Sequence, residues 1–189
     1  MCNHAALIRL SFMSELTQGP TALIALAITI AAANLPARAQ RPDSTPSAAR
    51  RLEPEKADSI VLERTACYGY CPVYRLRVGR EGEIALQWRA RDGKTHLAEW
   101  KMQPDSVRML LNAAQMEDLT ALPDRIADSK AYCPTQWTDH PTAIVSFFGP
   151  GWSKRIVDYY GCRWAPGALR DFEQLVDAFT GVRSHMGPS

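Results

Sequence analysis

Hydrophobic and polar residues alternate between residues 60 and 100, as expected of strands that bury one face and expose the other. Ile60 and Leu62 begin the pattern, and Asp92-Gly93 is typical of a tight hairpin turn between two of the later segments. The alternating segments cover residues 60–62, 73–78, 84–88 and 95–100. They predict an antiparallel meander, in which each strand pairs with the one before it.

The spacing of apolar residues changes to that of a helix after Pro104, which together with Asp105 is typical of a first helical turn. The apolar residues that share one face of this helix are Val107, Leu110, Leu111 and Ala114. We therefore expect an amphipathic helix of about three turns.

A second helix is predicted to begin at Pro166 and to end at Gly181. Its apolar stripe consists of Leu169, Phe172, Val176 and Phe179. Between the helices, residues 119–141 are predicted to be a loop, and residues 142–148 and 153–159 to be a hairpin. The whole predicts an α+β fold, an antiparallel sheet of meander plus hairpin with two helices packed on one face.

An apolar leader precedes the predicted fold. Residues 22–35 are mostly apolar, and the small-x-small string Ala37-Arg38-Ala39 follows them, as at a signal-peptidase site. The stretch is shorter than the about 20 residues that cross a bilayer as a helix. We expect a signal peptide at residues 1–39, a periplasmic or secreted protein, and no stable membrane span after cleavage.

The rest of the chain is predicted to be one domain with flexible ends. Residues 40–56 carry few bulky apolar residues and are predicted to be a disordered linker, residues 57–182 the single domain, and residues 183–189 a frayed tail. The leader holds two of the 22 basic residues and one of the 20 acidic residues, so the remaining chain is close to neutral. Without a basic stripe, no binding of nucleic acid is expected.

Four of the five cysteines fall in the predicted domain, and an even number in an exported chain indicates disulfides. We expect Cys67 to pair with Cys71 across a tight loop. Cys133 and Cys162 flank the predicted hairpin, so a bond between them would hold the preceding loop against the end of the hairpin. The other ways of pairing these four cysteines stay open at this point.

A redox or metal role for the cysteines is the alternative interpretation. Cys67 and Cys71 are spaced C-x3-C and precede a strand, whereas thioredoxin-type enzymes place C-x-x-C at the start of a helix, which lowers the thiol pKa. A zinc site would have to add His140, and only one close pair of cysteines is present. We therefore expect a structural disulfide, no metal and no cofactor.

Several short strings follow one another in a fixed order. They are Leu62-Glu63-Arg64-Thr65, Cys67-Tyr68-Gly69-x-Cys71-Pro72-Val73-Tyr74, Thr138-Asp139-x-Pro141, Lys154-x-Ile156-Val157-Asp158-Tyr159, and Pro166 before the last helix. This order resembles the bacterial family called domain of unknown function 6438, over about Ser59 to about Thr180. The resemblance implies a small bacterial domain, often behind an export signal, with no assigned reaction.

Asp139 and His140 are the candidate acid and base, and Asp158 could join them from the neighbouring strand. A hydrolytic site also needs a nucleophile within hydrogen-bonding reach, and no convincing one is present in the sequence. The alternative is that Thr138 and Asp139 brace the loop through backbone N–H groups.

Aromatic residues in the predicted loops and at strand ends form a candidate recognition surface, consisting of Tyr68, Tyr70, Trp137, Trp152 and Trp164. The alternative is that they cover the core of a small domain. The sequence thus favours an exported, non-enzymatic binding or structural module of the cell envelope with an envelope or extracellular partner. The competing hypothesis is a thiol-redox or hydrolytic enzyme that uses Cys67 and Cys71, or Asp139 and His140.

Overall fold

The computed structural model describes residues 52–186. The predicted signal peptide, linker residues 40–51 and tail residues 187–189 lie outside the described residues. Within residues 52–186, no helix is both long enough and apolar enough to cross a membrane.

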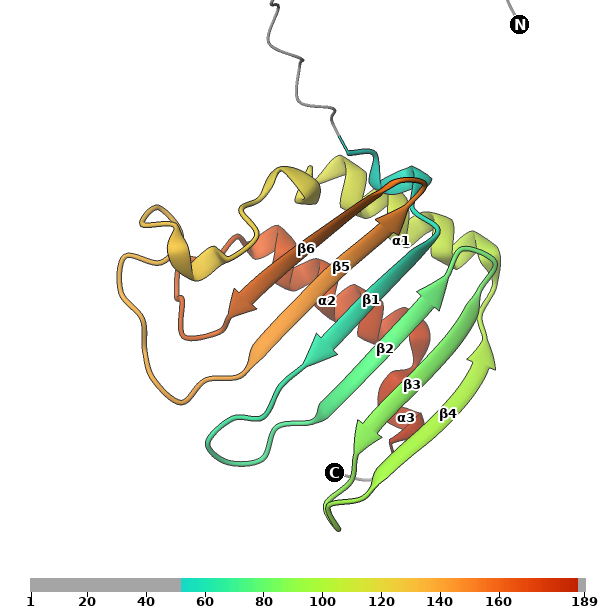
Figure 1. Ribbon diagram of the computed structural model, residues 1–189, viewed down its shortest axis with the longest axis horizontal. Coiled ribbons are helices and arrows are strands. Elements are labelled where there is room, and N and C mark those ends of the chain that lie inside the picture. The colour runs from blue at the N-terminus through green and yellow to red at the C-terminus, as the bar shows by residue number, and fades with distance from the viewer. Residues whose placement is uncertain (1–51, 187–189) are drawn as a thin grey trace, which may run out of the picture. The chain divides into compact units, whose positions relative to one another are not determined.

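A six-stranded antiparallel sheet forms the centre of the domain, in the order β4-β3-β2-β1-β5-β6 (Figure 1). The strands are β1 Ser59–Arg64, β2 Val73–Gly79, β3 Glu83–Arg89, β4 Thr95–Lys101, β5 Thr142–Gly149 and β6 Trp152–Tyr159. β1 to β4 pair in sequence order, and the β5–β6 hairpin joins the other side of β1. The predicted meander plus hairpin is confirmed.

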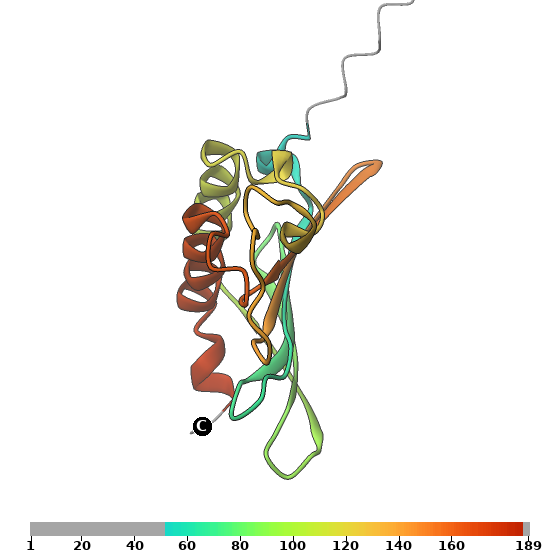
Figure 2. The same cartoon turned by 90° about the vertical axis from the view of Figure 1, so that its left-hand side faces the viewer.

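Both long helices, α1 Pro104–Met116 and α2 Gly167–Thr180, cover the same face of the sheet (Figure 2). Pro104 starts α1 at a position that needs no backbone N–H, and Gly181 ends α2 with a positive φ of 64°. The α+β class with helices on one face is therefore confirmed.

The core lies between this sheet face and the two helices. Phe147 of β5 is fully buried and contacts Phe172 of α2, with 5.7 Å between the ring centroids. Leu62, Leu76 and Leu110 are also buried there. Burial of each such side chain stabilises the fold by about 1.5–3 kcal/mol.

The folded domain extends beyond both predicted ends. Pro54–Lys56 form a short 3₁₀ helix (η1) in which Pro54 is buried, and the Leu52 carbonyl accepts a hydrogen bond from Thr120 Oγ1 at 3.2 Å. The linker was predicted to be disordered up to residue 56, but Pro54–Lys56 belong to the folded domain. Single-turn elements carry no periodic pattern that a sequence could show.

The predicted tail also contains structure, because Val182–His185 form a short helix, α3. The His185 ring stacks on Trp100 of β4 with 3.7 Å between centroids. Trp100 Nε1 donates a hydrogen bond of 3.1 Å to the Thr180 carbonyl. These contacts attach the end of α2 and α3 to β4, so the prediction of a frayed tail is wrong for residues 183–186.

The long connection between α1 and β5 is a loop with two 3₁₀ turns, η2 Leu119–Ala121 and η3 Ile126–Asp128. Ile126 is fully buried, and Arg125 forms a parallel bridge with Val157 of β6. This connection therefore covers the outer edge of β6.

Candidate functional site

The loop between β1 and β2, residues 65–72, is named the cysteine loop here. Cys67 and Cys71 are joined by a disulfide, and Gly69 takes a φ of 122° that side chains other than glycine rarely adopt. Tyr68 and Tyr70 are exposed on this loop. The short covalent ring thus presents two aromatic side chains from a restrained backbone.

A cavity of about 490 Å³, the outer cleft, lies beside the cysteine loop. Tyr70, Pro72 and Val73 line one side of this cleft. Residues 88–92, at the end of β3 and the start of the β3–β4 turn, line another side, and Arg183 with Met186 line the third. The cysteine loop and α3 lie at the same end of the molecule (Figure 2). The volume of the outer cleft lies within the range usual for small-molecule sites, about 300–1,000 Å³.

A second cavity of about 290 Å³, the inner cleft, lies on the other side of Pro72, Arg183 and Met186, which line both. Its walls come from the end of β1, the cysteine loop, Pro141-Thr142 and α2. Arg64, Tyr74, Tyr160 and Asp177 give it a polar floor. The two clefts therefore share a wall formed by the cysteine loop and the C-terminal segment.

That polar floor belongs to a buried network, named the Arg64 cluster: Arg64, Tyr74, Tyr160, Glu173 and Asp177. Arg64 follows Ile60 and Leu62 on the face of β1 turned to the helices, and it pairs with Tyr74 across the β1–β2 ladder. Glu173 and Asp177 are one helical turn apart on the buried stripe of α2. The pairing of the strands and the periodicity of the helix thus bring these groups together.

Arg64 uses its guanidinium in several directions. Nε donates to the Tyr74 hydroxyl at 2.8 Å and to Asp177 Oδ2 at 3.2 Å, and Nη2 forms an ion pair with the same oxygen at 3.0 Å. Nη1 donates to the Tyr160 hydroxyl at 2.6 Å and lies 3.6 Å from Glu173 Oε2. The tyrosine hydroxyls donate in turn, Tyr74 to Asp177 and Tyr160 to Glu173.

Burial dominates the electrostatics of this network. It raises the pKa of Glu173 to about 7, and the charge of Asp158 adds to the shift, while Tyr160, Arg64 and Arg170 oppose it. Burial also raises the pKa of Tyr160 to about 12, and it raises the pKa of Tyr74. Neutral phenols of this kind are poor nucleophiles near pH 7.

The charged form of Arg64 is favoured despite its burial. Burial by itself would lower the pKa of Arg64, but the Coulombic influence of Tyr74 and Asp177 outweighs it, and the net pKa is raised. Glu173 Oε1 has no hydrogen-bond partner within residues 52–186, although the residue is fully buried. A protonated Glu173 lessens the cost of that burial.

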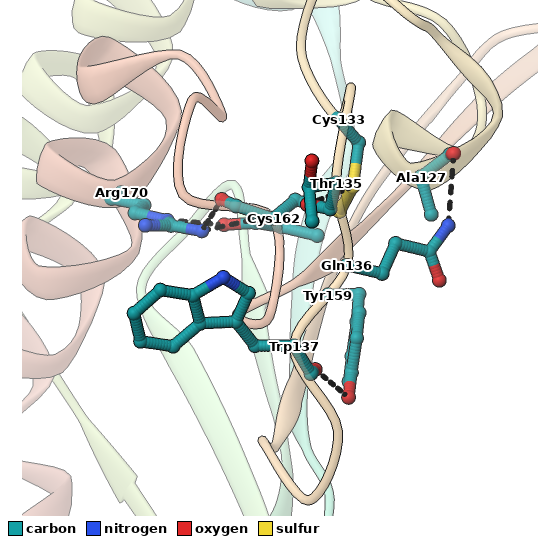
Figure 3. Close-up of a disulfide and its surroundings, with 9 residues drawn as sticks. Ala127, Cys133, Thr135, Gln136, Trp137, Tyr159, Cys162 and Arg170 are labelled. Carbon is teal, nitrogen blue, oxygen red and sulfur yellow. Dashed lines mark hydrogen bonds and ion pairs between the residues drawn. A yellow bond between two sulfur atoms is a disulfide. The ribbon is translucent and has the colours of Figure 1, made fainter.

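The second disulfide, Cys133–Cys162, is buried and lies beside Arg170 (Figure 3). Arg170 binds the fully buried Asp158 at 2.9 Å and donates to the Cys162 carbonyl at 2.7 Å. The Trp137 amide donates to the Gly161 carbonyl at 3.0 Å. The expected pairing of all four cysteines is thus present, and this disulfide joins the loop before β5 to the chain that leaves β6.

The candidate polar site of Asp139, His140 and Asp158 is not brought together by any contact in the described chain. Asp158 is buried and bound to Arg170, whereas Asp139 and His140 are exposed loop residues. No hydrogen bond or ion pair within residues 52–186 connects Asp158 to either residue. Asp139 takes a φ of 67°, and its carbonyl accepts the Tyr68 amide at 3.3 Å. It therefore braces the cysteine loop through its backbone.

The predicted aromatic surface is distributed over separate places. Only Tyr70 of these residues lines the outer cleft. Trp137 and Trp164 are exposed on the loops that Cys133–Cys162 connects. Trp152 is the first residue of β6, at the opposite end of the strands from the cysteine loop. Trp88 and Met186, which also line the cleft, were not among the predicted site residues.

The Arg64 cluster itself was missed by sequence reasoning. Glu173 and Asp177 fall among Leu169, Phe172 and Val176 on the apolar stripe of α2, and carboxylates in such positions indicate a buried partner. That signal was present in the sequence. The identity of the partner was not, because Arg64 is distant along the chain.

Within residues 52–186, no group of three or more His, Cys, Asp or Glu residues could hold a metal ion. Cys71 is followed by Pro72 and then by β2. The cysteine pair therefore lacks the helix N-terminus that lowers a thiol pKa.

No curated protein matches the chain. A family profile does match it, over residues 58–180, which covers nearly the whole described domain. The chain therefore belongs to the family described as domain of unknown function (DUF6438).

Proposed function

We propose that this domain is a non-enzymatic binding module that works outside the cytoplasm and takes its ligand in the outer cleft. The observation that carries the proposal is a cavity of about 490 Å³ whose walls come from three separate segments, each fixed in place by its own contacts. Small-molecule sites are commonly concave, largely apolar and formed before the ligand arrives.

Each wall of the cleft is held independently. The disulfide Cys67–Cys71 closes the cysteine loop, and the Tyr68 amide bonds that loop to Asp139. Stacking of His185 on Trp100 holds α3 against β4, and a second stacked pair, Trp88 with His96 at 5.2 Å, braces the end of the β3–β4 hairpin. A rigid cleft lowers the entropy cost of binding.

Location outside the cytoplasm is supported by the disulfides and by the leader. Both bonds join residues of the described domain, and disulfides persist in oxidising compartments. The apolar stretch and the small-x-small string of residues 22–39 provide the export signal in this proposal.

The test is a titration of the purified, ¹⁵N-labelled protein with naphthalene-2-methanol, a neutral aromatic probe, followed by ¹H–¹⁵N NMR. We expect shift changes to concentrate in residues 70–73, 88–92 and 183–186, which line the outer cleft. Tyr70→Ala should weaken binding about fivefold or more, because the ring forms part of the wall.

Trp164→Ala is the matched control, since Trp164 is an equally exposed aromatic outside the cleft (65% against 61% for Tyr70). Its affinity should stay within about twofold of the wild type. Shift changes scattered over the surface, or an equal loss in both variants, would contradict the proposed site.

A further inference from the structure

The charges around the outer cleft are unbalanced. Arg89, Arg91 and Arg183 line it, together with a single acidic residue, Asp92. Within residues 52–186, none of these three arginines forms an ion pair or a side-chain hydrogen bond with a carboxylate. The cleft therefore presents guanidinium groups that no carboxylate of residues 52–186 binds.

Asp92 does not neutralise them. Its Oδ1 accepts the Lys94 amide at 2.9 Å, and its Oδ2 lies 3.8 Å from Lys94 Nζ. The acid is thus engaged by the turn in which it lies, and Lys94 offsets its charge. The electrostatic field of the cleft remains that of the arginines.

Arg91 contacts Tyr70, another residue that lines the outer cleft. Its guanidinium carbon lies 4.0 Å from the centroid of the Tyr70 ring, the geometry of a cation–π contact. Within residues 52–186, no carboxylate accepts a hydrogen bond from this guanidinium, so its N–H donors are available to an acceptor. Those donors match a carboxylate in a two-pronged arrangement.

The remaining wall is apolar. Tyr70, Trp88 and Met186 present ring and thioether surfaces to the same cavity. A volume of about 490 Å³ suits a small molecule and not a folded protein. A ligand that satisfies both halves of the cleft has an apolar body and a negative group.

We infer that the outer cleft recognises a small organic anion, an aromatic or other apolar body that carries a carboxylate, with Arg91 and Arg183 binding the negative group. This inference rests on the proposed function, since it assigns a ligand class to the same site. It makes binding depend on salt, because exposed charges are screened within about 10 Å at 0.1 M ionic strength.

The experiment compares naphthalene-2-carboxylate with naphthalene-2-methanol, a neutral probe of nearly the same shape, on the purified protein by NMR titration. The carboxylate should bind about tenfold more tightly at low salt. Raising the NaCl concentration from about 20 mM to about 500 mM should weaken binding of the carboxylate but not binding of the alcohol.

Variants locate the negative group. Arg91→Ala and Arg183→Ala should each lower the affinity for the carboxylate about fivefold and leave the affinity for the alcohol nearly unchanged. Arg155→Ala is the matched control, because Arg155 is an exposed strand arginine that does not line the outer cleft. It should change neither affinity.

The outcomes separate the two claims. If both probes bind at the cleft with equal affinity, the anion inference is overturned and the proposed function stands. If neither probe shifts the cleft residues, both are overturned. Tetraglutamate, which has carboxylates without an apolar body, should bind about tenfold more weakly than the naphthalene carboxylate; tighter binding would replace a small ligand by an acidic peptide.

Discussion

The two disulfides of this domain perform different tasks, although their chemistry is the same. Cys133 and Cys162 are buried, lie 29 residues apart, and join the long loop before β5 to the short connection after β6. Cys67 and Cys71 are four residues apart and only half-buried, in a loop that lines both clefts. One bond closes a large part of the chain, whereas the other shapes a small and exposed surface.

The difference shows that the contribution of a disulfide depends on what surrounds it. Around Cys162, Arg170 binds the Cys162 carbonyl and the buried Asp158, and a backbone bridge links Gln136 to Cys162. Cys71, in contrast, lines the inner cleft, and its neighbours Tyr70 and Pro72 line the outer cleft. We therefore assign the stability of the fold mainly to the first region and ligand binding to the second.

The largest expected effect is on stability, and it distinguishes the two bonds. In the loop-entropy model, removing Cys133–Cys162 by Ala substitution of both residues costs about 3.6 kcal/mol of unfolding free energy, because the bond closes a long loop. Removal of the Cys67–Cys71 disulfide should lower the unfolding free energy by about 2 kcal/mol, because this bond closes a short loop. Urea unfolding of both double variants measures the difference; a reversed order would contradict the assignment.

The polar pair beside the buried disulfide should matter nearly as much. Arg170→Ala leaves Asp158 buried without its partner and removes the donor to the Cys162 carbonyl. We expect a loss of about 3 kcal/mol. Arg108→Ala is the matched control, since its ion pair with Asp105 is exposed and should contribute under about 1 kcal/mol. Equal losses in urea unfolding would show that the Asp158 contact is unimportant.

Glu173 gives a smaller effect that depends on pH. With its pKa raised from 4.5 to about 7, Glu173 holds its proton in the folded state after the unfolded chain has lost it. Its contribution to stability is therefore complete below about pH 4.5 and is lost as the pH rises to about 7.

Glu173→Gln removes this titration and keeps the shape of the side chain. The stability of the wild type relative to the variant should fall, on the order of 2–3 kcal/mol, from pH 4.5 to pH 7. Thermal or urea unfolding at several pH values measures it. A relative stability that is constant or rises with pH would show that Glu173 is ionised throughout.

Much of the fold could be predicted because its elements are written in local patterns. Alternation in Tyr74, Leu76 and Val78 fixes which face of β2 is buried, and the stripe of Leu169, Phe172 and Val176 does so for α2. Gly181 ends that helix by its positive φ. Each of these signals lies within a few residues of the element it specifies.

The candidate site could be predicted only in part, because clefts depend on contacts between distant segments. Tyr70 was identified from its place in the cysteine loop, but Trp88 and Arg183 join it only through the meander and the docking of α3 on β4. α3 itself is a single turn, too short for a periodic pattern. Such a site appears only when the topology is known.

The central claim is that the cysteine loop shapes the binding site while the buried disulfide supports the fold. The most direct measurement is the dissociation constant of naphthalene-2-carboxylate for the Cys67→Ser/Cys71→Ser and Cys133→Ala/Cys162→Ala variants, under conditions where circular dichroism shows both folded. We expect about a tenfold loss of affinity in the first variant and less than about a twofold change in the second. Unchanged affinity after opening the Cys67–Cys71 ring would contradict the claim.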